Sequence, residues 1–193
     1  MSVTLVLASG SPQRADLLGT LGVEFSIEVP VVDEARLPGE PPHTYVERLA
    51  RSKAEMVARP GVVAVGADTA VVHEGQVLGK PLHPAEAIAT LRRLAGEVHH
   101  VVTGVAVSAH VEGGLVTESV VESATVRMAP MTDTEIAAYV ATGEPLDKAG
   151  SYALQGRGGV LVQSVDGHPT TVVGLPVPVV VRLLARRGIV VLG

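Results

Sequence analysis

The sequence contains no cysteine and no tryptophan, and it has only one phenylalanine and three tyrosines. Without cysteine the chain can form no disulfide, no thiolate zinc site and no cysteine nucleophile. So few aromatic rings offer little surface on which nucleic acid bases could stack, and a net charge of -5 at pH 7 does not favour binding to a phosphate backbone. We therefore expect no nucleic acid partner.

Long apolar runs are also missing. No stretch approaches 18 apolar residues, and the N-terminus lacks the basic region and apolar stretch of a signal peptide. These absences predict no membrane partner and a cytoplasmic location. What the chain does have is a 47% hydrophobic fraction over 193 residues, enough for a substantial core. We predict a single domain over residues 1–193, built as one body or as two closely joined lobes.

Lysine is scarce among the 15 basic residues, since 12 of them are arginine. Arginine evidently supplies most of the surface charge, so Lys53, Lys80 and Lys148 are favoured at positions that need a compact ammonium, such as a phosphate site. Codon bias is the alternative explanation.

Helical and strand patterns alternate along the chain and predict a mixed α/β fold. Strands are expected at 3–7, 25–31, 99–109, 115–128 and 160–165, with a further strand near 62–72 that is interrupted at 66–69. Helices are expected at 12–21, 43–58, 84–94, about 132–143 and about 178–187. The fourth is predicted to begin with a capping box of Thr132 and Glu135. The runs 99–109 and 115–128 are predicted to pair antiparallel. A hairpin turn is expected at "HEGQ", and "GRGG" at 156–159 is predicted to be a flexible turn.

The helix at 43–58 has an unusual apolar face. Its stripe is predicted to comprise Val46, Leu49, Ala50 and Met56, and the spacing places Lys53 on the same face. A lysine that faces the interior must reach solvent, pair with a carboxylate or meet a ligand.

The first turn, "ASGSPQR", joins a strand to a helix through small residues. Gly10 permits a close backbone approach, and Ser11 with Pro12 predicts a capped helix start. Backbone N–H groups at such a start favour an anion, for which phosphate is the obvious candidate. A helix start with no ligand is the alternative.

Asp68 is the strongest single candidate for chemistry, because it interrupts a long apolar run. Its potential companions are Asp33, Glu34, Lys53 and Lys80. Carboxylates with lysines can hold a divalent metal and a polyphosphate while one carboxylate activates water. A turn-forming aspartate is the alternative. The seven histidines show no metal-ligand spacing, so we expect no zinc site.

Seven ordered motifs resemble those of the Maf family of nucleoside triphosphate pyrophosphatases, from about Leu5 to Leu184. They are "LASGSPQRADLL", "RLARSKA", "VGADTAVV", "LGKPLHPAEA", "VVTGVAV", "DKAGSYALQG" and "VVGLP". The resemblance implies an α/β fold like that of the inosine-triphosphate pyrophosphatases, with an elongated mixed sheet and a deep cleft between two lobes. It also implies a homodimer that hydrolyses a nucleoside triphosphate to the monophosphate and pyrophosphate with Mg2+ or Mn2+, as nucleotide-pool housekeeping. "GADT" with "DKAG…LQG" is similar to the branch that acts on dTTP and UTP.

The resemblance also implies roles for individual residues. Asp68 matches the catalytic base, and Glu34 matches an acidic position that helps to hold the metal, with Asp68 as the second expected metal ligand. The expected substrate contacts are Arg14, Lys53 and Lys80 on the triphosphate, Ser9 and Ser11 on phosphate, and Thr69 and Gln155 on the base. Gln13 departs from the family, which usually reads Ser-Pro-Arg-Arg here, and this puts the substrate preference in doubt.

Several alternatives stay open. The protein could carry out the same reaction on CTP, 7-methyl-GTP or a modified nucleotide. It could instead be a nucleotide-binding regulator of septum formation. Lys148 is expected either to pair with Asp147 or Glu144, or to contact the substrate near its base.

Overall fold

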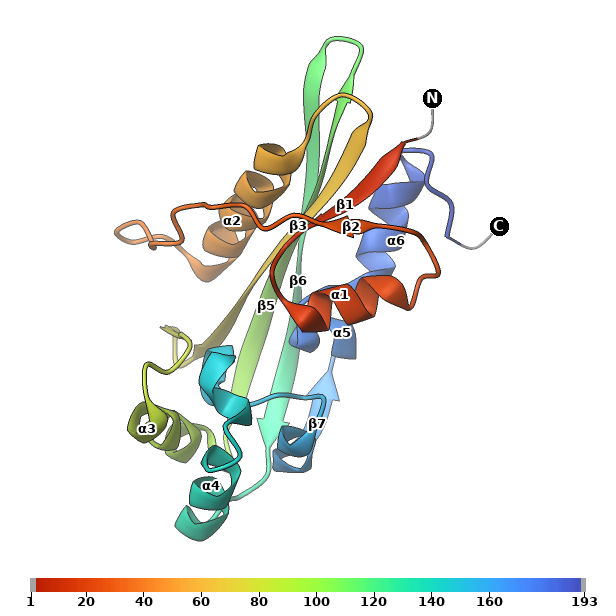
Figure 1. Ribbon diagram of the computed structural model, residues 1–193. Helices are drawn as coiled ribbons and strands as arrows, with labels where there is room; N and C mark the ends of the chain where they lie inside the picture. Colours follow the sequence, from red (N-terminus) through yellow and green to blue (C-terminus); the bar gives the residue numbers. More distant parts are fainter. Residues whose placement is uncertain (1–2, 192–193) are drawn as a thin grey trace. The chain divides into compact units, whose positions relative to one another are not determined.

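The computed structural model describes residues 3–191 (Figure 1). The chain divides into two compact units. The first comprises Met1–Asp68, Thr103–Glu122 and Gly174–Gly193, and the second comprises Thr69–Val102 and Ser123–Val173. Each unit is described by itself below, and the single domain expected over residues 1–193 stays a prediction.

The strands form a mixed sheet, which confirms the predicted α/β class. Its order is β2-β1-β3-β5-β6-β7, with β4 paired to β3. β1 runs parallel to β2 and β3, whereas β4 pairs antiparallel with β3 and β7 with β6. The strands are β1 (Thr4–Ala8), β2 (Ser26–Ile27), β3 (Val62–His73), β4 (Gln76–Leu78), β5 (Val98–Val111), β6 (Gly114–Met128) and β7 (Val162–Asp166).

Five helices begin and end close to the predicted residues, whereas α5 and the 3-10 turns were not predicted. The helices are α1 (Pro12–Gly19), α2 (Pro42–Val57), α3 (Pro84–Leu94), α4 (Asp133–Val140), α5 (Pro169–Val173), α6 (Val177–Ala185) and three short 3-10 turns, η1 (Glu144–Asp147), η2 (Ala149–Ser151) and η3 (Arg157–Leu161). Ser11 caps α1, and Thr132 forms the predicted capping box with Glu135 at α4. Across residues 3–191, no helix is long and apolar enough to cross a membrane.

In the first unit, α2 packs closely against β3 and β5. A Cβ atom added at Gly104 would lie 2.5 Å from the Val46 carbonyl oxygen, and one added at Gly66 would lie 2.7 Å from the Ala54 nitrogen. Both glycines are therefore required where helix and strand backbones meet. Figure 1 shows α2 on one side of these strands, with α1 and α6 on the other.

The predicted interruption of the third strand is wrong. β3 runs without a break from Val62 to His73, so Asp68 projects from a continuous strand rather than from a turn. The pattern Gly-Ala-Asp-Thr resembles a turn locally, but Gly66 is there because α2 lies against it. The register with β1 ends where Ala8 faces Gly66, two residues before Asp68.

The predicted inward face of α2 is largely confirmed. Val46, Leu49, Ala50 and Lys53 are buried, as expected. Met56 is 57% exposed, which contradicts the prediction. With 100° between successive residues, Met56 lies about a quarter of a turn from the centre of the buried stripe.

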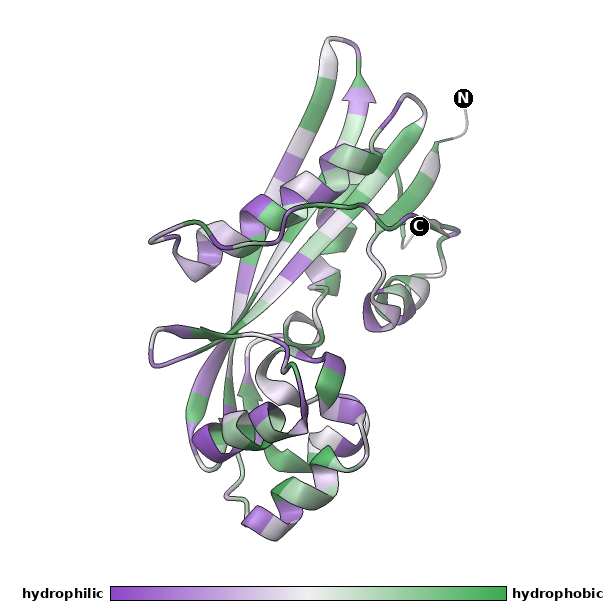
Figure 2. Ribbon diagram, turned by 60° about the vertical axis from the view of Figure 1, so that its left-hand side comes forward, coloured by the Kyte–Doolittle hydropathy of each residue, from purple (hydrophilic) through white to green (hydrophobic). Residues whose placement is uncertain are grey.

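The second unit has its own hydrophobic core beneath α3 and α4. The end of β6 alternates in burial, with Ala124, Val126 and Met128 buried and Arg127 exposed. Figure 2 shows bands of hydrophobic and hydrophilic residues along the strands. His99 is fully buried in this unit, and its Nε2 lies 2.8 Å from the hydroxyl of Tyr152.

Candidate functional site

The turn from β1 into α1 is organised by two serine hydroxyls. Ser11 Oγ accepts a hydrogen bond from the Arg14 backbone N–H at 3.4 Å, and Ser9 Oγ accepts one from the Ser11 N–H at 3.2 Å. The Arg14 guanidinium also contacts Ser9 Oγ and donates through Nε to the Gly174 carbonyl at 2.8 Å. The arginine is thus fixed beside the first turn of the helix, as a phosphate-binding role requires.

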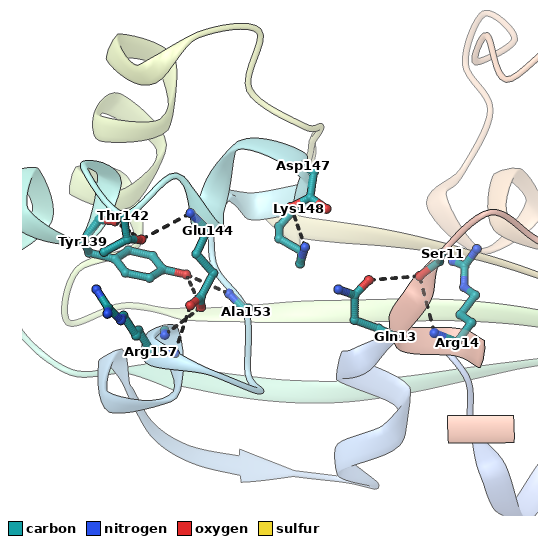
Figure 3. A network of polar contacts seen from close by, with 11 residues as sticks. Ser11, Gln13, Arg14, Tyr139, Thr142, Glu144, Asp147, Lys148, Ala153 and Arg157 are labelled. Atoms are coloured by element: carbon teal, nitrogen blue, oxygen red, sulfur yellow. Dashed lines mark hydrogen bonds and ion pairs between the residues drawn. The ribbon is translucent and has the colours of Figure 1, made fainter. Parts of the chain in front are cut away.

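Gln13 has a local role that the sequence did not indicate. Its Oε1 accepts a hydrogen bond from the Ser11 hydroxyl at 3.1 Å (Figure 3). With its oxygen engaged in this way, the side chain offers its amide N–H groups as donors, but it carries no charge. The helix start is therefore intact despite the departure from the family pattern at position 13.

Lys53 joins the two carboxylates that the sequence singled out. Its Nζ lies 2.7 Å from Asp68 Oδ1 and 2.6 Å from Glu34 Oε1. The side chains of Lys53 and Asp68 are 9% and 12% exposed, whereas that of Glu34 is 59% exposed. α2, β3 and the loop after β2 thus bring one ammonium and two carboxylates together. This confirms that Lys53 faces inward.

The loop that carries Glu34 is attached to α2 by two side chains. The Tyr45 hydroxyl donates to the Glu34 carbonyl at 3.0 Å, and Arg48 Nη2 donates to the Ala35 carbonyl at 3.0 Å. Arg48 also binds Glu40 through both carboxylate oxygens, at 2.7 and 2.8 Å. The hydrogen bonds from Arg48 lower the pKa of Glu40 to about 2. Helix α2 therefore carries both Lys53 and the groups that hold the loop.

Arg14 belongs electrostatically to the same site. Desolvation lowers the pKa of its guanidinium, and the negative charges of Asp68 and Glu34 act in the opposite direction. Since arginine stays protonated at physiological pH, the site contains two cations and two carboxylates. Such a mixture can bind a metal–polyphosphate complex, because the carboxylates attract the metal ion and the cations attract the phosphates.

The carboxylates are suited to a hard divalent cation. Glu34 and Asp68 contact the same ammonium, and oxygen donors are those that Mg2+ prefers. Within residues 3–191, no group of three or more His, Cys, Asp or Glu side chains could hold a metal. A cation here would need phosphate oxygens and water to complete its coordination, which is usual for Mg2+.

The remaining candidates lie in the second unit. Thr69 follows Asp68 on β3, Lys80 lies in an exposed turn after β4, and Gln155 is exposed between η2 and η3. The Gly150 N–H donates to the Gly79 carbonyl at 3.2 Å, which links the Lys80 turn to η2. That Thr69, Lys80 and Gln155 converge with Asp68 stays a prediction.

Lys148 and the "GRGG" segment of this unit also bear on the sequence predictions. Lys148 donates a hydrogen bond to Asp147, which is the pairing alternative (Figure 3). The "GRGG" segment is not the independent flexible turn that was predicted. Gly158 is buried, and its N–H donates to the Glu144 carboxylate at 2.9 Å. No sequence pattern indicated this contact, because Glu144 lies 14 residues away.

Comparison with known proteins finds relatives along nearly the whole chain. A family model described as "Maf-like protein" matches residues 4–187. A dTTP/UTP pyrophosphatase of Anaeromyxobacter dehalogenans (strain 2CP-C) is 50% identical over 188 residues, covering 97% of this chain and 96% of the relative. Proteins of the same name from Geotalea uraniireducens (strain Rf4) and Geobacter sulfurreducens are 47% and 46% identical over 186 residues. Both alignments cover 95% of this chain. They cover 95% of the Geotalea protein and 96% of the Geobacter protein. The chain therefore belongs to the Maf family.

Proposed function

We propose that this protein hydrolyses dTTP and UTP to the corresponding monophosphate and pyrophosphate. Relatives of 46–50% identity that align along nearly the whole chain carry that activity in their names. The observation that carries the proposal is the contact of Lys53 with both Asp68 and Glu34 beside Arg14. Water forms a new P–O bond at the α-phosphorus, the bond to the bridging oxygen breaks, and pyrophosphate leaves.

Asp68 is the proposed general base. It lies on a rigid strand and its carboxylate is oriented by the Lys53 ammonium, so one oxygen can face the attacking water. A proton taken from that water passes to a carboxylate oxygen of Asp68. Lys53 holds the carboxylate in place during this transfer, because the Glu34 carboxylate fixes the ammonium from a second direction.

The basic residues are proposed to bind the triphosphate. Arg14 is held against the helix start by Ser9 and Gly174, where it can neutralise phosphate charge. Backbone N–H groups at the start of α1 add a favourable dipole. Lys80 is exposed and is proposed to contact the pyrophosphate portion of the substrate. Thr69 and Gln155 are proposed to contact its base.

Glu34 and Asp68 are proposed to hold a single Mg2+ or Mn2+ ion. When bound, the ion would supply positive charge that neutralises the leaving pyrophosphate. Glu34 is the more exposed of the two carboxylates and so is the more accessible to an arriving metal–nucleotide complex. We further propose that the protein acts in the cytoplasm as a homodimer and that it keeps the nucleotide pool in balance.

The test is pyrophosphate release by the purified protein with Mg2+ and with Mn2+, measured separately for dTTP, UTP, CTP, 7-methyl-GTP, GTP, ATP and ITP. The proposal expects dTTP and UTP to have the highest kcat/KM, with no release when the metal is chelated. A preference for another triphosphate would overturn the substrate assignment but not the reaction. Bound nucleotide without release of pyrophosphate would overturn the reaction and favour a regulatory protein.

A further inference from the structure

The segment around Gln155 is held on its N-terminal side by a tyrosine. The Ala153 backbone N–H donates to the Tyr139 hydroxyl oxygen at 3.1 Å, and the same hydroxyl donates to Glu144 Oε1 at 3.0 Å. Figure 3 shows this hydroxyl between the backbone of Ala153 and the carboxylate. Tyr139 is only 6% exposed and belongs to the core of the second unit, so it is a rigid support.

The C-terminal side of the same segment is held by the glutamate itself. Glu144 Oε2 accepts a hydrogen bond from the Arg157 N–H at 3.0 Å, and Oε1 accepts one from the Gly158 N–H at 2.9 Å. Burial acts to raise the pKa of Glu144, but these backbone N–H donors, the Tyr139 hydroxyl and the charge of Lys148 together outweigh it and the pKa is lowered. One carboxylate therefore closes a short loop whose only exposed amide side chain is that of Gln155.

Two glycines show how closely the loop lies on this support. A Cβ atom at Gly156 would lie 3.0 Å from Glu144 Oε2, and Gly156 has φ of +92°, which side chains disfavour. A Cβ atom at Gly158 would collide with the Tyr139 hydroxyl. The loop thus has little freedom to move toward the carboxylate, and its hydrogen bonds prevent it from moving away.

A glutamine amide carries both a donor and an acceptor, so it distinguishes two bases only when its backbone is held in one place. UTP and CTP differ in the pyrimidine at position 4, which is a carbonyl acceptor in UTP and an amino donor in CTP. We propose that Glu144 and Tyr139 are positioning residues that fix the backbone on both sides of Gln155 and thereby set the preference for UTP over CTP. This inference rests on the proposed function.

The experiment compares kcat/KM for UTP and for CTP in Glu144→Gln, Tyr139→Phe, Gln155→Ala and the double variant Glu144→Gln/Gln155→Ala. Asp133→Asn is the control, because it removes a carboxylate of the same unit whose partner is the exposed Arg92. We expect Glu144→Gln and Gln155→Ala each to lower the UTP-to-CTP ratio about tenfold, the scale of one lost hydrogen bond. The double variant should lower it no further, and Asp133→Asn should leave it unchanged.

A second readout does not depend on activity. Amide hydrogen exchange at Ala153, Arg157 and Gly158 should be faster in Glu144→Gln than in the unmodified protein, and unchanged in Asp133→Asn. Unchanged exchange in Glu144→Gln would overturn the inference. So would a UTP-to-CTP ratio that Glu144→Gln or Gln155→Ala leaves unaltered, or additive losses in the double variant. If the unmodified protein releases no pyrophosphate from any triphosphate, the proposed function fails and the selectivity role fails with it.

Discussion

The ammonium of Lys53 and the carboxylate of Asp68 form an ion pair of 2.7 Å in which both side chains are almost entirely buried. Lys53 comes from α2 and Asp68 from β3, so the pair joins a helix to the strand on which it packs. Removal of Lys53 would leave the buried Asp68 carboxylate without its ammonium partner, which is far more costly than the loss of an exposed pair.

The first prediction follows from that burial. Lys53→Met should lower the free energy of unfolding by about 3 kcal/mol and should abolish pyrophosphate release. Denaturant unfolding and a turnover assay measure the two effects. Arg59→Met, which removes an exposed pair with Glu28, should change stability by less than about 1 kcal/mol. Equal losses in the two variants would contradict the assigned role of Lys53.

A second prediction concerns the attachment of the Glu34 loop to α2. Arg48→Met removes the hydrogen bonds to Glu40 and to the Ala35 carbonyl, so Glu34 should be less well positioned. We expect the metal concentration for half-maximal activity to rise about tenfold. This is the effect typical of losing contacts that orient a metal-binding residue. Arg51→Met, which alters another arginine of the same helix, should leave the metal dependence unchanged. A rise in both variants would indicate general damage to α2.

Much of this framework could be predicted from the sequence, because its signals are local. The Ser11 cap, the Thr132 capping box and the inward face at Lys53 depend on residues within one or two turns, and the structure confirms them. The family motifs singled out Glu34, Lys53 and Asp68, and the structure brings these three side chains together. Their roles in the reaction stay predictions.

The wrong predictions involve residues whose roles are set by distant parts of the chain. The immediate neighbours of Gly66 predict a turn. Its actual role is to let the backbone of α2 approach, and the part of that helix that contacts it precedes it by more than ten residues. Glu144 was considered only as a partner of Lys148, and its contacts with the backbone at 157 and 158 become visible only when the chain is folded. The strand expected at 25–31 is reduced to two residues, Ser26–Ile27.

A third prediction concerns acid stability. Burial lowers the pKa of His99 to about 4 from an ordinary value of 6.5. Between these values the unfolded chain binds a proton that the folded protein does not, so stability is lost as pH falls from about 6.5 to about 4. The loss should reach about 3 kcal/mol. Urea unfolding at a series of pH values measures it.

The matched variants for that titration are His99→Phe and His100→Gln. His99→Phe should lose most of the pH dependence between pH 6.5 and 4, although its stability at pH 7 should also fall because Tyr152 loses its hydrogen-bond partner. His100 lies next on the same strand and its side chain is exposed, so His100→Gln should keep the dependence. If His99→Phe kept the full acid loss, another group would be responsible.

A fourth prediction addresses the departure at position 13. Gln13→Arg adds a permanent charge and a guanidinium fork beside the proposed triphosphate site, so KM for dTTP should fall about fivefold with little change in kcat. Gln13→Lys restores the charge without the fork and should give a smaller effect. Steady-state kinetics with dTTP and UTP measure both. An unchanged KM in the two variants would place position 13 away from the phosphates.

The most direct test of the central claim is the turnover of Asp68→Asn on dTTP with saturating Mg2+ or Mn2+, together with its affinity for the nucleotide. Asparagine has nearly the same shape but cannot accept a proton from water, so kcat should fall by at least about a thousandfold while dTTP still binds. Asp16→Asn, at an exposed position of α1, should keep full activity. Full turnover by Asp68→Asn would show that Asp68 is not the base.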